Sequence, residues 1–285
     1  MNYIDKNKLN KIIAAALKED LGKRDITSES LILNDKSCVA ILLAKQDCVV
    51  CGLEIAKLVF IAQDKNINFK LLVKDGDYIK KGASLAKVSG KARSLLTAER
   101  VALNFLCLLS GIATKTRKYV FAVKPYKAKI VDTRKTIPGL RILQKYAVRT
   151  GGGSNHRVRL DEMVLIKDNH LKFLGNEFWS NGCKIKPSKV KIEIEVKTLK
   201  ELAKALKLQP DVIMLDNMSL ANMKKAVKMR NTNSPSVKYS FPKLEASGNV
   251  TLKNVKKVAS TRVDMISVGA LTHSVNSVDI SLEII

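Results

Sequence analysis

Arginine is concentrated in one part of a chain that otherwise draws its positive charge from lysine. The 285 residues include 51 lysines and arginines, of which only 11 are arginine. Five of those 11, two of the three histidines and the glycine run 151–153 lie between Asp132 and His170. A guanidinium is a planar fork that matches two oxygens of a carboxylate or phosphate, whereas an ammonium is a point charge. The cluster therefore predicts a site for an anionic ligand, with a solvated basic surface as the alternative.

Charged and small polar residues also recur where short apolar segments end. In chain order they are Arg134 with Lys135, Lys167, Glu195, Asp216, Ser247 with Gly248, and Gly269. The apolar segments are rich in Val, Ile, Leu and Met, and helical patterns lie between several of them, which is typical of a parallel sheet. Because the carboxyl ends of the strands meet at one face of an α/β barrel, the pattern predicts a barrel with its site there. A doubly wound sheet, the alternative, would gather ligands only around its switch point.

The segment 191–196, KIEIEV, shows how such a site would divide its charge. Its side chains alternate, so Lys191, Glu193 and Glu195 share one face of the strand. In a barrel this charged face points inward, where carboxylates are unstable unless they pair with cations or bind a metal. With Asp216, Glu195 forms an acidic half that suits Mg²⁺. The alternative is that both carboxylates serve only as structural ion-pair partners.

A third element suits a phosphate group. Ser247, Gly248 and Asn249 precede an expected helix over 250–260, and backbone N–H groups at a helix N-terminus favour anions. Gly269 would let the backbone approach the same group. Alone, the first tripeptide could be an ordinary turn. Together with the basic and acidic halves, it predicts a phosphate- and diphosphate-bearing substrate beside a second one that bears carboxylates.

The rest of the chain must position these groups. The apolar spacing predicts an amphipathic helix over 6–20, short strands over 69–90 and a long helix over 95–120. Strands then alternate with helices expected over 198–208 and 219–230, with Ser219 as an N-cap.

Composition bounds the class of protein. Hydrophobic residues make up 46% of the chain, and the start has no apolar core of the signal-peptide type. No stretch approaches the length of a membrane span, so we expect a cytoplasmic protein. The five cysteines, which include Cys48 and Cys51 in a C-x-x-C, lack a second pair or a His pair, which favours structural thiols over a zinc site.

The net charge of +25 raises the possibility of nucleic-acid binding. The lysines are spread evenly along the chain, however, and aromatic residues make up only 5% of it. No basic tail or stacking set accompanies the charge, so we expect small anionic substrates and no nucleic-acid partner.

Nine motifs, in order and over nearly the whole chain, resemble the quinolinate phosphoribosyltransferase family. They are EDLGKRDIT, LLTAERVALNFLCLLSGIAT, DTRKTIPGLR, RTGGGSNHR, LIKDNHL, IEIEV, MLDNM, LEASGNV and SVGALTHS. The resemblance implies transfer of phosphoribose from phosphoribosyl pyrophosphate to quinolinate with decarboxylation, giving nicotinate mononucleotide, pyrophosphate and CO₂ for NAD synthesis. A paralogue of the molybdenum-transport-associated type, acting on another acidic acceptor, is the alternative.

The resemblance also implies a role for each matching residue. Arg134, Arg157 and Lys167 would hold the quinolinate carboxylates, with His156 lining the pocket. Around the ribose, diphosphate and Mg²⁺ would lie Lys135, Glu195 and Asp216, the last two as metal ligands. Two further sets would complete the substrate site: Thr133 with Arg134 and Lys135, and the 5-phosphate loops Ser247, Gly248, Asn249, Val268, Gly269 and Ala270.

The implied fold is an α/β sandwich domain over 1–107, completed by 274–285, and an open α/β barrel over 108–273. Arg100 would reach into a partner's site, which makes a homodimer the working unit, with a hexamer as the larger alternative. The chain departs from the family pattern at Arg24, at Glu162 and in a longer segment over 234–243.

Overall fold

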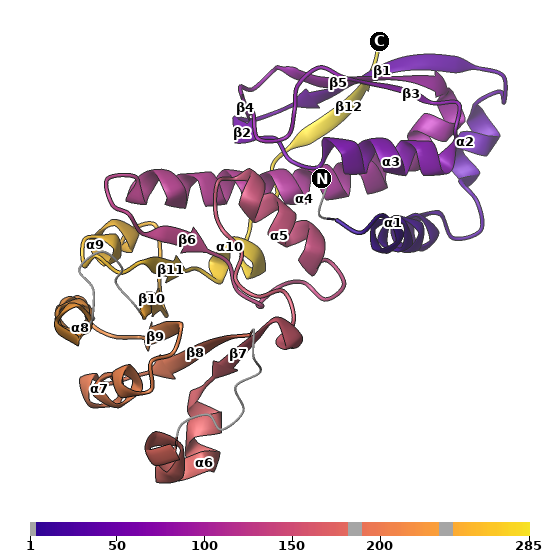
Figure 1. Ribbon diagram of the computed structural model, residues 1–285. Helices are drawn as coiled ribbons and strands as arrows, with labels where there is room; N and C mark the ends of the chain where they lie inside the picture. The colour runs from indigo at the N-terminus through magenta and orange to yellow at the C-terminus, as the bar shows by residue number, and fades with distance from the viewer. Residues whose placement is uncertain (1–3, 182–189, 234–241) are drawn as a thin grey trace. The chain divides into compact units, whose positions relative to one another are not determined.

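The computed structural model describes residues 4–181, 190–233 and 242–285, which group into two units. The first unit consists of Met1–Arg117, Thr136–Gly152 and Leu271–Ile285, and the second of Lys118–Lys135 and Gly153–Ala270. Each unit has a sheet of its own (Figure 1).

The first unit contains a four-stranded antiparallel sheet in the order β12-β1-β5-β3. Its strands are β1 (Ser37–Ala44), β3 (Asn68–Leu71), β5 (Ser84–Lys91) and β12 (Ile280–Ile284). The C-terminal strand β12 thus pairs with β1, so the two ends of the chain contribute to one sheet. A two-stranded pair, β2 (Cys48–Val49) with β4 (Tyr78–Ile79), adjoins these strands in sequence.

The first unit also contains the helices α1 (Lys6–Leu21), α2 (Ile26–Leu31), α3 (Leu53–Gln63) and α5 (Arg141–Thr150). It includes most of α4 (Ala92–Val123) and of α10 (Ala270–His273), whose residues 118–123 and 270 belong to the second unit. The amphipathic helix predicted over 6–20 is confirmed by α1, which buries Leu9 and Ile13 and is capped by the Asp5 carboxylate. Burial raises the pKa of the Cys51 thiol, and that of Cys48 to about 11, so neither is held as a thiolate.

The long helix α4 differs in one respect from expectation. Its length and hydropathy would allow it to cross a membrane, so the expectation that no stretch approaches that length was too strict. However, 61% of the apolar window is buried inside the protein, as in the core helix of a globular fold.

The glycine run 151–153 belongs to the architecture. Gly151 ends α5 where it meets α4, and a Cβ there would lie 2.5 Å from the Ala113 carbonyl oxygen and 2.7 Å from Thr116 Cβ. Gly152 has a φ of +91°, in the region that favours glycine. Gly151 is therefore required for close packing and Gly152 for the direction of the chain.

The second unit contains a six-stranded parallel sheet in the order β6-β11-β10-β9-β8-β7. The strands are β6 (Lys129–Val131), β7 (Met163–Ile166), β8 (Lys191–Val196), β9 (Val212–Asp216), β10 (Lys243–Ser247) and β11 (Met265–Ser267). All six predicted strands are confirmed in one sheet. Within the described ranges no pairing joins the edge strands β6 and β7, so the barrel-like sheet is open.

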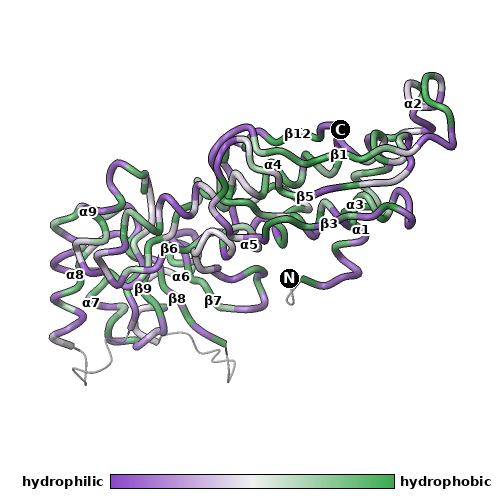
Figure 2. The backbone as a smooth tube through the Cα atoms, turned by 90° about the horizontal axis from the view of Figure 1, so that it is seen from above, coloured by the Kyte–Doolittle hydropathy of each residue, from purple (hydrophilic) through white to green (hydrophobic). Residues whose placement is uncertain are grey.

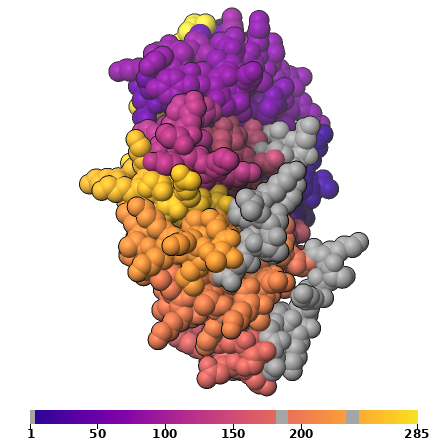
Figure 3. Space-filling model, turned by 60° about the vertical axis from the view of Figure 1, so that its left-hand side comes forward, coloured from indigo at the N-terminus to yellow at the C-terminus, as the bar shows by residue number. Residues whose placement is uncertain are grey.

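Helices follow the strands of this unit: α6 (Asp168–Asn181), α7 (Leu199–Lys207), α8 (Leu220–Asn233) and α9 (Val255–Ala259), with a 3₁₀ turn at Leu160–Glu162. The helix α7 buries Leu202 and Ala205, and the hydropathy along it and α8 alternates (Figure 2). These two helices contact one another, and this part of the chain forms the orange surface in Figure 3. The Ser219 hydroxyl accepts the Asn222 N–H, which confirms the predicted N-cap.

The helix expected over 250–260 is wrong in its first half. Asn249 has a φ of +49°, and the Asn254 side chain donates to the Asn249 carbonyl and accepts from the Thr251 N–H. These local bonds fold 251–254 into a turn, so α9 begins only at Val255. The phosphate loop therefore does not lie at a helix N-terminus.

We predict that Gly151→Ala lowers the free energy of unfolding by about 2–3 kcal/mol, because the added methyl group clashes with the α4 backbone. Gly139→Ala is the control: nothing lies within 4 Å of its Cβ, and only a φ of +79° opposes the change, which costs about 1 kcal/mol. Urea unfolding measures both, and equal losses would contradict the packing role of Gly151.

Candidate active site

The structure places the predicted residues of the second unit along the carboxyl edge of its sheet. Arg134 and Lys135 follow β6, Lys167 follows β7, and Glu195 precedes the last residue of β8. Further along, β9 and β10 end in register with Asp216 opposite Ser247. Val268, Gly269 and Ala270 come directly after β11. Parallel pairing therefore gathers these residues at one edge, as expected from the sequence.

The acidic half is built by the neighbouring strands β8 and β9. Burial raises the pKa of Glu195, and the negative charges of Asp216 and Asp168 raise it further. Lys167 and Lys197 act in the opposite direction. The two carboxylates predicted as metal ligands thus lie close enough to repel one another, which a cation between them would relieve.

A cavity of about 360 Å³ opens beside Glu195. It is lined by α6 and by the chain that follows β8, including Lys172, Trp179 and Lys197. Lys197 forms a 2.9 Å ion pair with Asp168. Trp179 lines this cavity and also contacts the Phe178 ring edge to face.

The basic half centres on two guanidinium groups. Burial lowers the pKa of Arg157, the positive charge of Arg134 lowers it further, and Glu193 partly offsets this. Arg157 Nη1 donates to the Met163 carbonyl at 2.8 Å, while its Nε is buried without a hydrogen-bond partner among the described residues. A buried donor that lacks an acceptor, beside a second cation, favours binding of an anion.

The turn after β6 is fixed by short polar contacts. The Thr133 hydroxyl accepts the Lys135 N–H at 3.1 Å. Asp132, which is fully buried, accepts the His156 N–H at 2.9 Å and the Asn155 side-chain amide at 2.6 Å. We predicted no role for Asp132. Its position directly after an apolar strand could have indicated one.

Asn217, which we did not predict as a site residue, locks the loop of Ser247, Gly248 and Asn249. Its backbone N–H donates to the Ser247 carbonyl, and its side-chain oxygen accepts from Asn249 at 3.2 Å. The same side chain donates to Asp216 at 3.0 Å. A Cβ on Gly248 would collide with this amide, so Gly248 must be glycine. Asn217 thus connects the acidic half to the predicted phosphate loop.

Other residues singled out from the sequence belong to different elements. Arg100 belongs to α4 in the first unit, where its exposed side chain lies 4.0 Å from Glu99. Arg24 is also exposed, and Glu162 accepts the Val158 N–H at 2.6 Å. Most of the segment 234–243 lies outside the described residues.

The chain matches two family models, the N-terminal domain of quinolinate phosphoribosyl transferase over residues 25–110 and its C-terminal domain over 112–283. A probable nicotinate-nucleotide pyrophosphorylase (carboxylating) of Bacillus subtilis is 41% identical over 286 residues, covering 100% of this chain and 95% of that protein. The corresponding protein of Methanocaldococcus jannaschii is also 41% identical, over 96% of each chain. The solved nicotinate-nucleotide pyrophosphorylase of Francisella tularensis has a TM-score of 0.92 at 37% identity, covering 100% of this chain and 98% of that one.

We predict that Asp216→Asn lowers the pKa of Glu195 toward the ordinary value of a glutamate, because one of the charges that raise it is removed. A carboxyl group whose folded pKa is raised destabilises the fold as pH rises from its unfolded pKa to its folded pKa. The variant should therefore lose less stability than wild type over that pH interval. Carboxyl ¹³C NMR titration measures the shift, and an unchanged Glu195 titration would contradict the contact between the two groups.

Proposed function

Because the chain belongs to the quinolinate phosphoribosyltransferase family, it transfers phosphoribose to quinolinate with decarboxylation, and we propose that it does so at the carboxyl edge of the six-stranded sheet. The observation that carries this proposal is the meeting, at one edge, of a basic half, an acidic half and the interlocked loop predicted to bind phosphate. A paralogue acting on another acidic acceptor is not favoured, since the relatives named above are carboxylating pyrophosphorylases or match their structures.

In the proposed arrangement Arg134, Arg157 and Lys167 hold the two carboxylates of quinolinate. The buried Nε of Arg157 would gain its missing acceptor from a substrate carboxylate. The loops of Ser247–Gly248–Asn249 and Val268–Gly269–Ala270 bind the 5-phosphate, and Asn217 holds the first loop in place. The protein thereby aligns the acceptor nitrogen with the ribose carbon.

Departure of pyrophosphate gives the ribose oxocarbenium character. Glu195 and Asp216 stabilise that positive charge electrostatically, and Lys135 contributes a positive charge toward the leaving diphosphate. In the decarboxylation that follows, the positively charged pyridinium ring accepts the electron pair, so the protein mainly orients the carboxylate and excludes water.

We propose that the acidic half also holds Mg²⁺. The mutual repulsion that raises the pKa of Glu195 fits a cation site, and carboxylate oxygens are the ligands that Mg²⁺ prefers. When bound, the ion would neutralise negative charge on the diphosphate. Glu195 and Asp216 would be its protein ligands.

We further propose a homodimer in which Arg100 of each chain completes the other chain's site. The guanidinium of Arg100 is exposed and lies 4.0 Å from its ion-pair partner Glu99, so it is able to contact a substrate anion. Closure into a hexamer and a cytoplasmic location both remain predictions.

Mixing Arg100→Ala with an inactive site variant should restore about a quarter of the wild-type activity if sites are shared, whereas no recovery would exclude sharing.

The direct test of the function supplies quinolinate, phosphoribosyl pyrophosphate and Mg²⁺. Release of nicotinate mononucleotide and of ¹⁴CO₂ from carboxyl-labelled quinolinate is expected. Turnover with nicotinate but not with quinolinate would overturn the assignment.

We predict that Arg157→Lys raises the KM for quinolinate at least tenfold, equivalent to about 1.4 kcal/mol, because the planar fork is lost while the charge is kept. Arg159→Lys is the matched control, since Arg159 is exposed and pairs with Asp161 and Glu162. Steady-state kinetics compares them, and equal KM values would remove Arg157 from the acceptor pocket.

We predict that Asn217→Ala raises the KM for phosphoribosyl pyrophosphate about tenfold and changes that for quinolinate less than twofold. The reason is that the phosphate loop loses the amide that connects it to Asp216, a change of about 1.4 kcal/mol. Asn222→Ala, in the first turn of α8, serves as the control. Equal effects on both substrates would indicate general disruption instead.

A further inference from the structure

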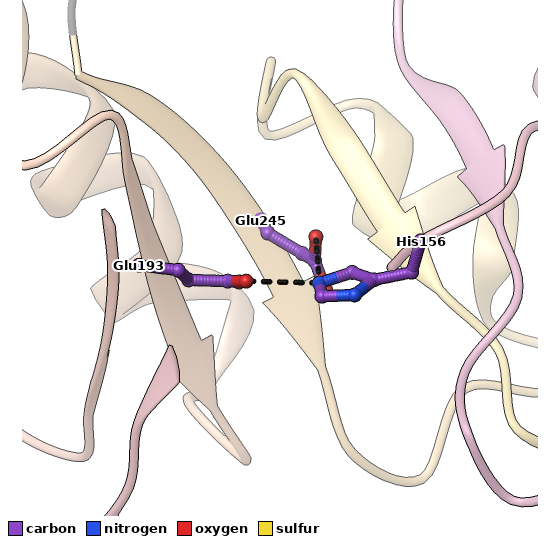
Figure 4. Close-up of side chains that lie close together, drawn as sticks. All are labelled: His156, Glu193 and Glu245. Atoms are coloured by element: carbon purple, nitrogen blue, oxygen red, sulfur yellow. Dashed lines mark hydrogen bonds and ion pairs between the residues drawn. The ribbon is translucent and has the colours of Figure 1, made fainter. Parts of the chain in front are cut away.

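A buried cluster of His156, Glu193 and Glu245 lies inside the second unit, and the mechanism above assigns nothing to its two carboxylates (Figure 4). Glu193 comes from β8 and Glu245 from β10, and both are fully buried. His156 Nε2 lies 2.8 Å from one oxygen of Glu193 and 3.8 Å from one oxygen of Glu245. Three of the four carboxylate oxygens have no hydrogen-bond partner among the described residues.

The backbone fixes the tautomer of the ring. The Arg157 N–H donates to His156 Nδ1 at 2.9 Å, so Nδ1 carries a lone pair. In the neutral ring the proton is then on Nε2, which donates to Glu193. Both nitrogens of the neutral ring are therefore engaged within the protein.

Two buried carboxylates so close together cannot both be ionised without a large penalty. Burial and the charge of Glu193 raise the pKa of Glu245 to about 8, with Asp132 adding to the rise and His156 and the Ser267 hydroxyl opposing it. Near pH 7 the raised pKa therefore favours a proton on Glu245.

The same three residues could be taken for a metal site, since their ligand atoms lie within 4.8 Å of one another. A metal on Nε2 would need the proton on Nδ1, and metal-bound histidines normally donate that second N–H to an acceptor. Here a backbone N–H of Arg157 points at Nδ1 instead. The hydrogen-bond direction thus favours a proton-bearing cluster over a metal centre.

We propose that Glu193 and Glu245 are positioning residues that hold His156 as the neutral Nε2–H tautomer and, through its Nδ1, fix the backbone of Arg157 for binding an acceptor carboxylate. The proposal rests on the acceptor role of Arg157 given above. It explains why two costly buried carboxylates lie next to the histidine that precedes Arg157: they act on the histidine and not on the substrate.

Three variants test the proposal: Glu193→Gln, Glu245→Gln and, as control, Asp211→Asn. Asp211 accepts the Ile192 N–H at the opposite end of the same sheet. Long-range ¹H–¹⁵N NMR of the free protein should show the Nε2–H tautomer for His156 in wild type and Asp211→Asn. In Glu193→Gln we expect loss of that single tautomer and a KM for quinolinate raised about tenfold, with the KM for phosphoribosyl pyrophosphate changed less than twofold.

The pH profile separates positioning from mere packing. Above pH 8 Glu245 ionises in wild type, so the KM for quinolinate should rise several-fold between pH 7 and pH 9. In Glu245→Gln it should stay constant over the same interval. The proposal would be overturned by parallel pH profiles of the KM in wild type and Glu245→Gln, or by an Nδ1–H tautomer of His156. It would also be overturned if wild type bound one equivalent of metal that Glu245→Gln did not bind. Absence of nicotinate mononucleotide with wild type would instead overturn the function, and the NMR result would still decide the tautomer.

Discussion

The parallel register of the six-stranded sheet is the constraint on which the site depends. It sets Asp216 opposite Ser247 and brings Glu195 beside them, so charged and phosphate-binding groups share one edge. Strands fixed in this way cannot move like charges apart without losing their hydrogen bonds. One consequence is the raised pKa of Glu195, which burial causes and which the negative charge of Asp216 on the neighbouring strand increases. The fold thus holds charges that a ligand of opposite sign would stabilise.

The opening of the sheet determines how the acceptor side is built. Ser154 forms a parallel β-bridge with Val131, the last residue of β6. In the loop that follows, His156 lies close to Glu193 of β8 and Glu245 of β10. The same loop carries Arg157, whose backbone N–H donates to His156. Through that histidine, the buried carboxylates of Glu193 and Glu245 support the proposed acceptor side, and not the metal and ribose side.

Much of this arrangement could be predicted from the sequence, because strand identity and strand ends are local properties. Six apolar segments gave six strands, and the alternation in KIEIEV indicated that Glu193 and Glu195 share a face. The contacts of Glu245 and of Asn217 with the site residues were not predictable, because they depend on the register between the strands. The helix expected from Val250 failed for a local reason, the left-handed backbone of Asn249 and its bond from Asn254.

The central claim is that a dicarboxylate acceptor binds at the basic half of the carboxyl edge. A crystal structure of the protein with quinolinate tests it most directly. The account predicts the two carboxylates on Arg134, Arg157 and Lys167, with His156 beside the ring and both its nitrogens still bonded to the protein. Quinolinate bound away from these residues, or His156 released from Glu193 and bonded to a carboxylate, would contradict it.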